Sequence, residues 1–339
     1  MPFYFCPVKS ILIVAALCFT VGNLQAQLLP AFGGSRSGTT GLQFLKLGPD
    51  ARSNALSGAV VGEINDEAAV FWNPAGIVEL DSQKLYLQTG HTAYYAGTDI
   101  NHAAVVFQPE QFRSFGFGLM NMKSPEMPVT TEFMPLGTGQ TFSVNDLLLS
   151  LSYAQVLTEN FRFGASLKYA NENIAGIVAQ AGLVDFGFQY KVGVKDLMFG
   201  VAISNFGFNV TPSGEINLVG FGNQDEVVSN FDELSVPASF KMGFSGTAYQ
   251  KNGHRLLALA QLNHPTDNQE SLALAFEYSR NGLLFLRTGY ALGVQGNFPT
   301  FGGGINLYRR FGSLRIDYAL LGKNTMGVSQ QITLAASIW

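Results

Sequence analysis

LRIDYALL, residues 314–321, sets apolar side chains at alternate positions and separates them with Arg315 and Asp317. FRFGASLKY, residues 161–169, repeats the pattern with Arg162 and Lys168 between its apolar positions. Successive side chains of a strand point to opposite faces, so a period of two predicts β-strands with one apolar face. A slip of one residue would move charges onto that face, which defines the strand register well.

The same alternation recurs from residue 83 to the C-terminus in segments of roughly ten residues, near the length with which a tilted strand crosses a membrane. These segments are 83–91, 102–110, 114–123, 144–156, 160–171, 182–191, 195–205, 236–248, 254–263, 270–279, 282–291, 299–308, 312–320 and 328–338. Their number is even, as in bacterial outer-membrane barrels. The sequence therefore predicts an all-β fold, a 14-stranded antiparallel transmembrane β-barrel over residues 83–339.

The connections between these segments alternate between long and short. The long ones are 92–101, 124–143, 172–181, 206–235, 264–269, 292–298 and 321–327. Outer-membrane barrels have short periplasmic turns and longer outer loops, whereas a secreted soluble β protein has no reason to alternate. We therefore expect a location in the cell outer membrane, in contact with its lipid, with both ends of the chain in the periplasm.

Composition excludes several other classes of protein. Of 339 residues, 47% are hydrophobic and 13% are charged, which argues against intrinsic disorder. Lys plus Arg total 20 against 24 acids, and without a basic run this argues against a nucleic-acid partner.

Residues 1–26 have the pattern of a secretory signal peptide. Lys9 is followed by an apolar run over 11–21 and by Ala26 before the expected cleavage site. Cys6 and Cys18 both fall in this segment, so the mature chain is expected to contain neither a disulfide nor a thiol nucleophile.

Residues 27–82 lack sustained alternation and are expected to form a polar lead and a hatch. Pro49-Asp50 predicts a short helix over 51–56, and a second over 67–72 should stop at Asn73-Pro74. The segment is either a plug inside the barrel or periplasmic decoration. Glycines on the inward phase either make room for such a plug or let a curved sheet bend. They are Gly116, Gly118, Gly164, Gly187, Gly200, Gly243, Gly302 and Gly304.

The hatch segment resembles the N-terminal signature of the PorV/PorQ family of outer-membrane barrels, distant relatives of the FadL long-chain fatty-acid transporters. The resemblance is carried by Phe44-Leu45-Lys46-Leu47-Gly48, Ala51-Arg52, Ala55-Leu56-Ser57-Gly58-Ala59, Asp66-Glu67-Ala68-Ala69 and Trp72-Asn73-Pro74-Ala75-Gly76. It implies a 14-stranded barrel with an N-terminal hatch, in which Asn73, Pro74, Ala75 and Gly76 form the hatch motif. Family members with assigned roles serve the type IX secretion system. This chain is shorter than expected of PorV and closer to generic members.

No motif for catalysis, cofactor binding or metal binding is present. His91, His102, His254 and His264 have no metal-ligand spacing and are expected at the surface or an interface. No Gly-x-Ser-x-Gly elbow occurs, so we expect no enzyme, although a lipase-type barrel could place Ser and His on its wall without a local motif.

Inward-phase charges of mixed sign predict ion pairs across the lumen, or with the hatch residues Asp50, Arg52, Asp66 and Glu67. The candidate lumen charges are Arg162, Asp185, Lys241, Glu277, Arg315 and Asp317. Lys168 and Lys191 share the inward phase, and a solvated place near the periplasmic rim is the alternative for these two.

The two longest loops carry apolar residues that predict a surface for a partner or ligand, or else a lid over the barrel mouth. The candidates are Met127, Phe133, Met134, Phe206, Phe208, Leu218 and Phe221.

Three functions are open at this point. The leading prediction is a component of type IX secretion that binds cargo or translocon proteins. The alternative is a FadL-like channel for hydrophobic small molecules, and the third is a structural outer-membrane protein. A continuous apolar groove into the lumen would favour the channel, whereas a sealed lumen with exposed apolar loop tips would favour a protein partner.

Overall fold

The computed structural model describes Gly38 and residues 40–78, 84–132, 134–194, 196–219, 225–294, 296–309, 312–324 and 326–338. The expected signal peptide and the loop residues Phe133 and Phe221 lie outside these ranges, and the side chain of Leu218 is not described.

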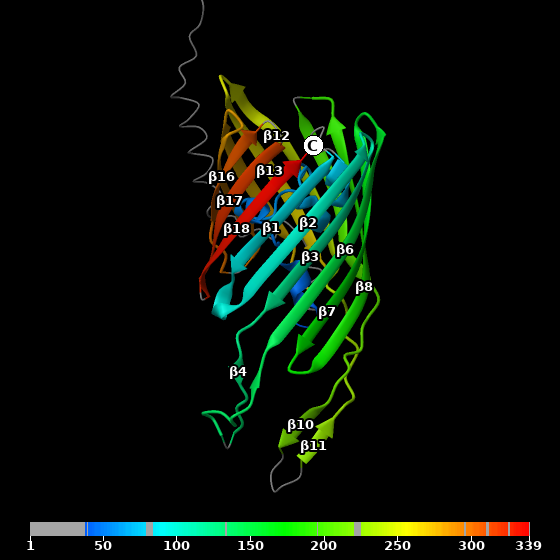
Figure 1. Cartoon of the computed structure of the whole chain (residues 1–339), viewed down its shortest axis with the longest axis vertical. Helices are drawn as coiled ribbons and strands as arrows, with labels where there is room; N and C mark the ends of the chain where they lie inside the picture. The colour runs from blue at the N-terminus through cyan, green and yellow to red at the C-terminus, as the bar shows by residue number, and fades with distance from the viewer. Residues whose placement is uncertain are drawn as a thin grey trace, which may run out of the picture. The chain divides into compact units, whose positions relative to one another are not determined.

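Fourteen antiparallel strands form a closed barrel (Figure 1), which confirms the predicted fold. They are β1 (Leu85–Ala93), β2 (Asp99–Glu110), β3 (Arg113–Lys123), β6 (Val144–Thr158), β7 (Phe161–Ile174), β8 (Ile177–Val192), β9 (Leu197–Gly207), β12 (Ser239–Lys251), β13 (His254–Pro265), β14 (Ser271–Arg280), β15 (Leu284–Leu292), β16 (Thr300–Arg309), β17 (Gly312–Lys323) and β18 (Gly327–Ile338). β1 pairs with β18 from Leu85–Ile338 to Ala93–Gln330 and so closes the sheet. Closure leaves no strand edge unpaired, the condition that hydrocarbon imposes on a spanning sheet.

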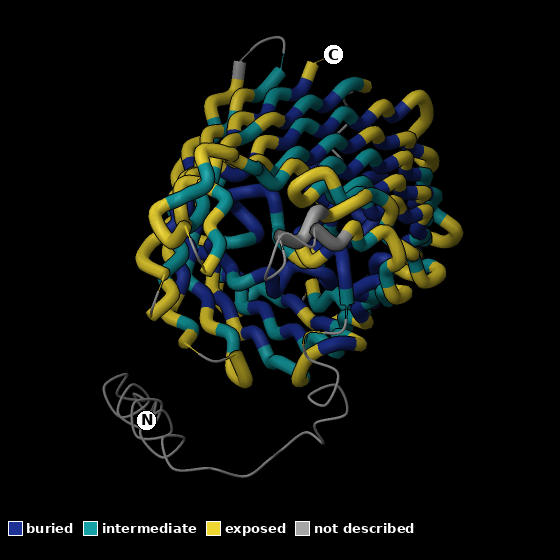
Figure 2. Tube along the Cα trace, turned by 90° about the horizontal axis from the view of Figure 1, so that it is seen from below, coloured by how far each residue is buried: buried dark blue, intermediate teal, exposed yellow. Residues whose placement is uncertain are grey.

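Exposed and buried residues alternate along the strands, and the buried ones line the lumen (Figure 2). Outward positions form a belt of large apolar side chains, including Phe115, Phe117, Leu151, Leu167, Phe186, Phe244, Phe276, Leu286, Phe301, Ile316 and Leu334. Large apolar side chains exposed on most strands of the barrel have the chemistry of a hydrocarbon-facing surface.

On the side of the C-terminus, consecutive strands are separated by only two to four residues. On the opposite side, two loops carry hairpins that extend past the barrel, β4 (Met127–Pro128) with β5 (Thr141–Phe142) and β10 (Ile216–Val219) with β11 (Asp225–Val228) (Figure 1). We call this side the outer side, because outer-membrane barrels carry their long loops there.

The prediction of a long loop over residues 172–181 is wrong. β7 and β8 continue through it and meet in a two-residue turn, in which Ala175 and Gly176 both have positive φ, 54° and 89°. This is the geometry of a tight hairpin turn, and the Asn173 side chain accepts a hydrogen bond from Gly176 N at 3.1 Å. Polar residues beyond the apolar belt made this part of the strands look like a loop. Phe206 was likewise expected in a loop and lies in β9.

The hatch segment folds into short helical turns inside the barrel. They are η3 (Gln43–Lys46), α2 (Ala51–Ala55), α3 (Ala69–Trp72) and η4 (Pro74–Val78), while η5 (Tyr95–Gly97) lies in the β1–β2 loop. Asp50 caps α2 by accepting a hydrogen bond from Ser53 N at 2.8 Å. None of the helices in the described ranges is long and apolar enough to cross a membrane.

Candidate functional site: the hatch and the cavity beside it

Wall glycines form the seat of the hatch. A methyl group added at Gly118 would lie 2.7 Å from a Val70 methyl carbon, and one at Gly164 would lie 2.6 Å from Pro74 O. Real Cβ atoms do not approach other heavy atoms so closely, so these positions must lack a side chain for the hatch to sit where it does. Gly116, Gly187, Gly200, Gly243, Gly289 and Gly302 are in similar contact with hatch atoms. Seven of the eight inward glycines named from the sequence therefore make room for a plug, whereas a methyl group at Gly304 would meet the wall side chains Asp317 and Arg287.

The hatch motif lies at the centre of this contact. Asn73 is fully buried and donates to Val61 O at 2.7 Å, while its Oδ1 accepts from Ala75 N at 3.2 Å. Its amide thus joins two turns of the hatch. Pro74 and Ala75 then lie flat against the glycines of β7 and β8.

A buried charge network joins the hatch to the wall. Arg52 of α2 contacts Glu63 (2.9 Å) and Asp66 (3.2 Å) within the hatch and Glu277 of β14 (3.3 Å). Such pairs add little net stability, but removal of one member leaves a buried charge without a partner.

Wall residues extend this network on both sides. Arg315 of β17 reaches Asp66 (3.1 Å) and Glu67 (3.3 Å), and its Nε lies 2.9 Å from Asp317. Arg287 of β15 bridges Glu277 and Asp317 at 2.6 Å each. Arg287 and Glu63 are not among the charges expected from the sequence to line the lumen. Arg287 lies on the inward phase of the predicted strand 282–291, and this position could have identified it.

The remaining lumen candidates lie elsewhere on the wall. Asp185 pairs with Lys168 and also accepts from Asn205 N at 2.7 Å. Lys168 is therefore buried, and the solvated rim position considered for it is wrong, whereas Lys191 is exposed. Arg162 is buried, and the Lys241 ammonium lies 5.2 Å from the centre of the Trp72 ring.

The hatch carboxyl groups respond differently to their surroundings. Burial raises the pKa of Glu67 to about 7; Arg315 opposes this rise, while Asp66 and Asp317 add to it. Burial likewise raises the pKa of Glu63 against the influence of Arg52. For Asp66, burial is outweighed by Arg315 and Arg52, which hold its pKa below the ordinary value.

We expect the seated hatch to loosen between about pH 5 and pH 8. A pKa of about 7 for Glu67 in the seated hatch, against an ordinary 4.5, means that seating favours the protonated carboxyl. This stabilisation is complete below pH 4.5 and is lost as the pH rises through 7. Hydrogen exchange of peptides from residues 50–78, corrected for intrinsic rates, should be at least about tenfold faster at pH 8 than at pH 5.5. Glu67→Gln should reduce the pH dependence, and equal protection of the wild type at both pH values would contradict the assignment.

An apolar cluster fills one side of the lumen. Leu42, Phe44 and Phe71 of the hatch segment pack against Met120 and Leu148 of the wall. His102 lies beside this cluster, 2% exposed and edge-on to Phe71 at 6.1 Å. The expectation of a surface or interface histidine is therefore wrong for His102, because β2 begins at Asp99 and turns this position inward.

A cavity of about 850 Å³ lies between the hatch and the barrel wall. Its hatch wall is formed by Leu45, Leu47, Gly48 and Trp72, and Trp72 Nε1 donates to Asp50 Oδ1 at 2.6 Å. Its barrel wall comes from the outer ends of β9, β12, β13, β14 and β17 and from the loops 266–270 and 293–299, through Asn205, Ser239, Lys241, Gln261, Asn263, Pro265, Asn268, Gln269, Ser271, Gly293, Val294 and Lys323. The volume is within the usual range for small-molecule sites.

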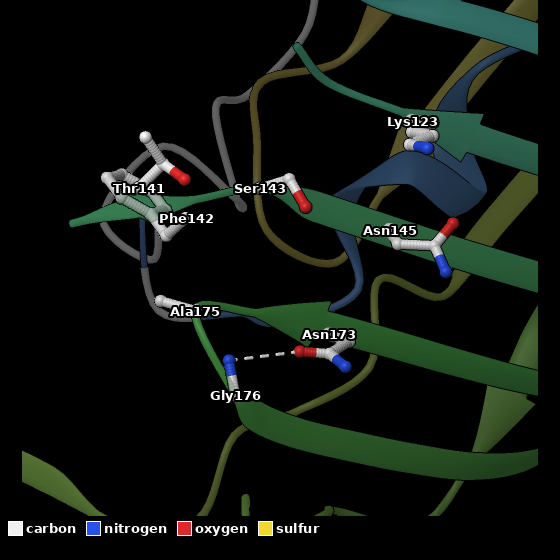
Figure 3. Close-up of a pocket in the computed structure, with 8 residues that line it drawn as sticks. All are labelled: Lys123, Thr141, Phe142, Ser143, Asn145, Asn173, Ala175 and Gly176. Atoms are coloured by element: carbon white, nitrogen blue, oxygen red, sulfur yellow. Dashed lines mark hydrogen bonds between the residues drawn. The ribbon is translucent and has the colours of Figure 1, made fainter. Parts of the chain in front are cut away.

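A second hollow, of about 490 Å³, lies at the outer ends of β3, β6 and β7 (Figure 3). Lys123, Asn145 and Asn173 border it, and all three occupy outward-phase positions. It is therefore on the outer surface of the barrel, just beyond the apolar belt, and not in the lumen.

The described candidate loop residues are spread over different elements. Met127 lies in β4 and Met134 in the turn beyond it, 54% exposed. Phe206 is at the end of β9, and Phe208, which follows it, is 90% exposed.

Within the described residues, no three His, Cys, Asp or Glu side chains are grouped in a way that could hold a metal ion. The described part of the lumen holds the packed hatch, the charge network and the cavity beside them.

Comparison with known proteins finds similarity of fold. No family model and no curated protein matches the sequence. Among solved structures, the toluene transporter TbuX of Ralstonia pickettii is 14% identical with a TM-score of 0.60, over 86% of this chain and 98% of that one. The CymD monoaromatic hydrocarbon channel is 13% identical with a TM-score of 0.57, over 86% and 96%. A Pseudomonas aeruginosa FadL homologue is 13% identical with a TM-score of 0.56, over 86% and 98%.

The fold defines a class: a closed 14-strand antiparallel barrel like those of FadL-type outer-membrane proteins, with its lumen occupied by its own N-terminal segment. The similar solved structures are transporters and channels, not enzymes. The PorV/PorQ resemblance has no support from any family or sequence match.

Proposed function

We propose that this chain is a hatch-gated channel of the outer membrane for small organic molecules. The observation that carries the proposal is the cavity of about 850 Å³ bounded by the hatch on one side and the wall on the other. A ligand in this cavity contacts the hatch directly. If its contacts with a shifted hatch are more favourable than those with the seated hatch, binding moves the hatch toward the shifted position. Similar folds described as hydrocarbon channels support the proposal.

The proposal corresponds to the alternative drawn from the sequence, a FadL-like channel for hydrophobic small molecules. The apolar belt supports insertion of the barrel in a lipid bilayer. The short connections beside the C-terminus support a periplasmic location for that rim of the barrel. The seat of glycines and the ion pair from Arg52 to Glu277 support a hatch that is held inside the barrel by shape and by ion pairs.

Liposome swelling tests the channel. Vesicles containing the protein should swell in isotonic solutions of small organic solutes faster than protein-free vesicles, with rates that differ between solutes of equal size. Vesicles containing an equal amount of a closed barrel without a channel serve as the control. Rates equal to those of the control for every solute tried would contradict the proposal.

One observation favours a second function, binding of a protein partner on the outer side. Leu136 is 99% exposed at the end of the β4–β5 hairpin, and Phe208 is 90% exposed at the start of the next long loop. Exposed apolar loop tips are typical of interaction sites. The type IX secretion role predicted from sequence would use such a surface for cargo or translocon proteins.

Gentle extraction from the native outer membrane, followed by mass spectrometry, tests the second function. A partner that binds through this surface should be recovered with the wild type and lost when residues 127–142 are replaced by a short Gly-Ser turn. A shortened 324–326 connection is the matched control on the same side. Equal recovery by all three proteins would contradict this function.

A further inference from the structure

The cavity is polar and carries positive charge. Thirteen of its 21 lining residues have polar side chains. Three of them are lysines, Lys46, Lys241 and Lys323, and no Asp or Glu is among the residues that line it in the described part of the chain. The whole chain has a net charge of −4, so this local excess of cations runs against the composition.

One of the three lysines is neutralised by a neighbour. Lys46 Nζ lies 2.8 Å from Asp267 Oδ2, which also accepts from Thr40 and Gln43. Asp267 is 3% exposed and is not among the residues that line the cavity, so its charge is taken up by Lys46.

Lys241 has no such carboxylate. Among the described residues its ammonium has neither a hydrogen bond nor an ion pair, and its contact is the face of Trp72 at 5.2 Å. The charges within electrostatic reach are Lys168 and Asp185, which form a pair with each other, and Asp185 also accepts from Asn205 N. The three groups together leave one positive charge uncompensated, directed at the cavity.

An ammonium at the edge of a partly enclosed cavity is a strong anion site. Withdrawal of the ammonium from water costs free energy, and a charge-assisted hydrogen bond to an anion offsets this cost. The Coulomb attraction between the ammonium and an anion is also stronger in the cavity than in bulk water. Lys323, at the outer end of β17, lies on the same cavity and adds to the positive potential that an anion entering from the outer side meets.

We propose that the cavity binds a compact organic acid, with its carboxylate on Lys241 and its own hydroxyl or carbonyl groups against the polar wall of Ser239, Asn268 and Gln269. A wholly apolar ligand would bury these polar groups without partners, which costs about as much as the apolar contact gains. Trp72 and Leu47 supply the apolar side on which the ligand's carbon skeleton rests. This inference names a ligand class for the proposed channel. Binding at Lys241 is independent of the channel, and only transport of the ligand rests on the proposed function.

Tryptophan fluorescence tests binding directly, because the chain has two tryptophans and Trp72 lines the cavity. In a Trp339→Phe background, glucuronate should change the Trp72 emission in a saturable way. Glucuronamide, which has the same shape without the charge, should bind at least about tenfold more weakly. Lys241→Gln should weaken glucuronate by about the same factor and leave glucuronamide unchanged, while Lys191→Gln, at an exposed position of β8, should alter neither.

The outcomes separate this inference from the channel itself. Saturable glucuronate binding that depends on Lys241, without any flux into vesicles, would support the site and contradict the channel. Flux of neutral aromatics with no binding of glucuronate, or binding equal for glucuronate and glucuronamide, would overturn the site and leave the channel standing. Heat-dependent gel mobility shows whether the Lys241→Gln variant is folded. If it is not, Lys241→Arg, which keeps the positive charge, is used instead and should retain glucuronate binding.

Discussion

Replacing Gly164 with alanine should force the hatch out of its seat while the barrel remains closed. The added methyl group would lie 2.6 Å from Pro74 O and closer still to Ala75 N, so it meets backbone that has no rotamer with which to move away. Overpacking of this kind costs about 1–3 kcal/mol and more where the neighbour is rigid. Because the outward face of β7 is unchanged, the loss should fall on hatch docking rather than on strand pairing.

The measurement is hydrogen exchange of peptides from residues 69–78 together with single-channel conductance. Both should increase in Gly164→Ala, the exchange by at least about tenfold. Gly182→Ala is the matched control, since a methyl group there meets nothing within 4 Å and belongs to the neighbouring strand. Unchanged exchange and conductance in Gly164→Ala would show that the hatch does not rest on this glycine.

Replacing Arg52 with glutamine should release the hatch by a different route. Glu63, Asp66 and Glu277 all converge on this guanidinium, so its loss leaves three buried carboxylates close together without their shared partner. Removing one member of a buried ion pair costs about 3–5 kcal/mol. The expected result is loss of protection over residues 50–78, with barrel strands still protected.

A matched control separates this effect from a general loss of charge. Arg113→Gln changes an exposed arginine at the start of β3 and should leave hatch protection as it is. In a double-mutant cycle, Glu277→Gln should cost less in the Arg52→Gln background than in the wild type, because the contact with Arg52 is already lost and only the contact with Arg287 remains to be removed. Additive costs would contradict a direct Arg52–Glu277 contact.

Much of the barrel could be predicted because its signals are local. The period of two in LRIDYALL requires only neighbouring positions, and β17 extends over Gly312–Lys323 around it. The cap of the first hatch helix was also local, since Asp50 bonds to Ser53 three residues later. The turn at Ala175-Gly176 escaped prediction because alanine is not a typical residue for positive φ.

The site depended on distances that the sequence does not state. Arg52 and Glu277 are 225 positions apart, and they meet only because the closed barrel brings β14 beside α2. The inward phase identified Glu277 and Lys241 as lumen residues, but which of them has a partner depends on where the hatch lies. The cavity follows from the same placement and could not be foreseen.

A reversible disulfide between hatch and wall tests the central claim most directly. Ser57 Oγ of the hatch lies 2.9 Å from Thr300 Oγ1 of β16, and Cys6 and Cys18, the two natural cysteines, fall in the expected signal peptide. A Ser57→Cys, Thr300→Cys double variant, expressed from Gln27 behind a host signal peptide, should form one bond that holds the hatch to the wall. Solute flux into vesicles should then be lost under oxidising conditions and return on reduction, with the wild type unaffected by either. Equal flux in the oxidised and reduced double variant, with the bond shown to have formed, would contradict a channel gated by this hatch.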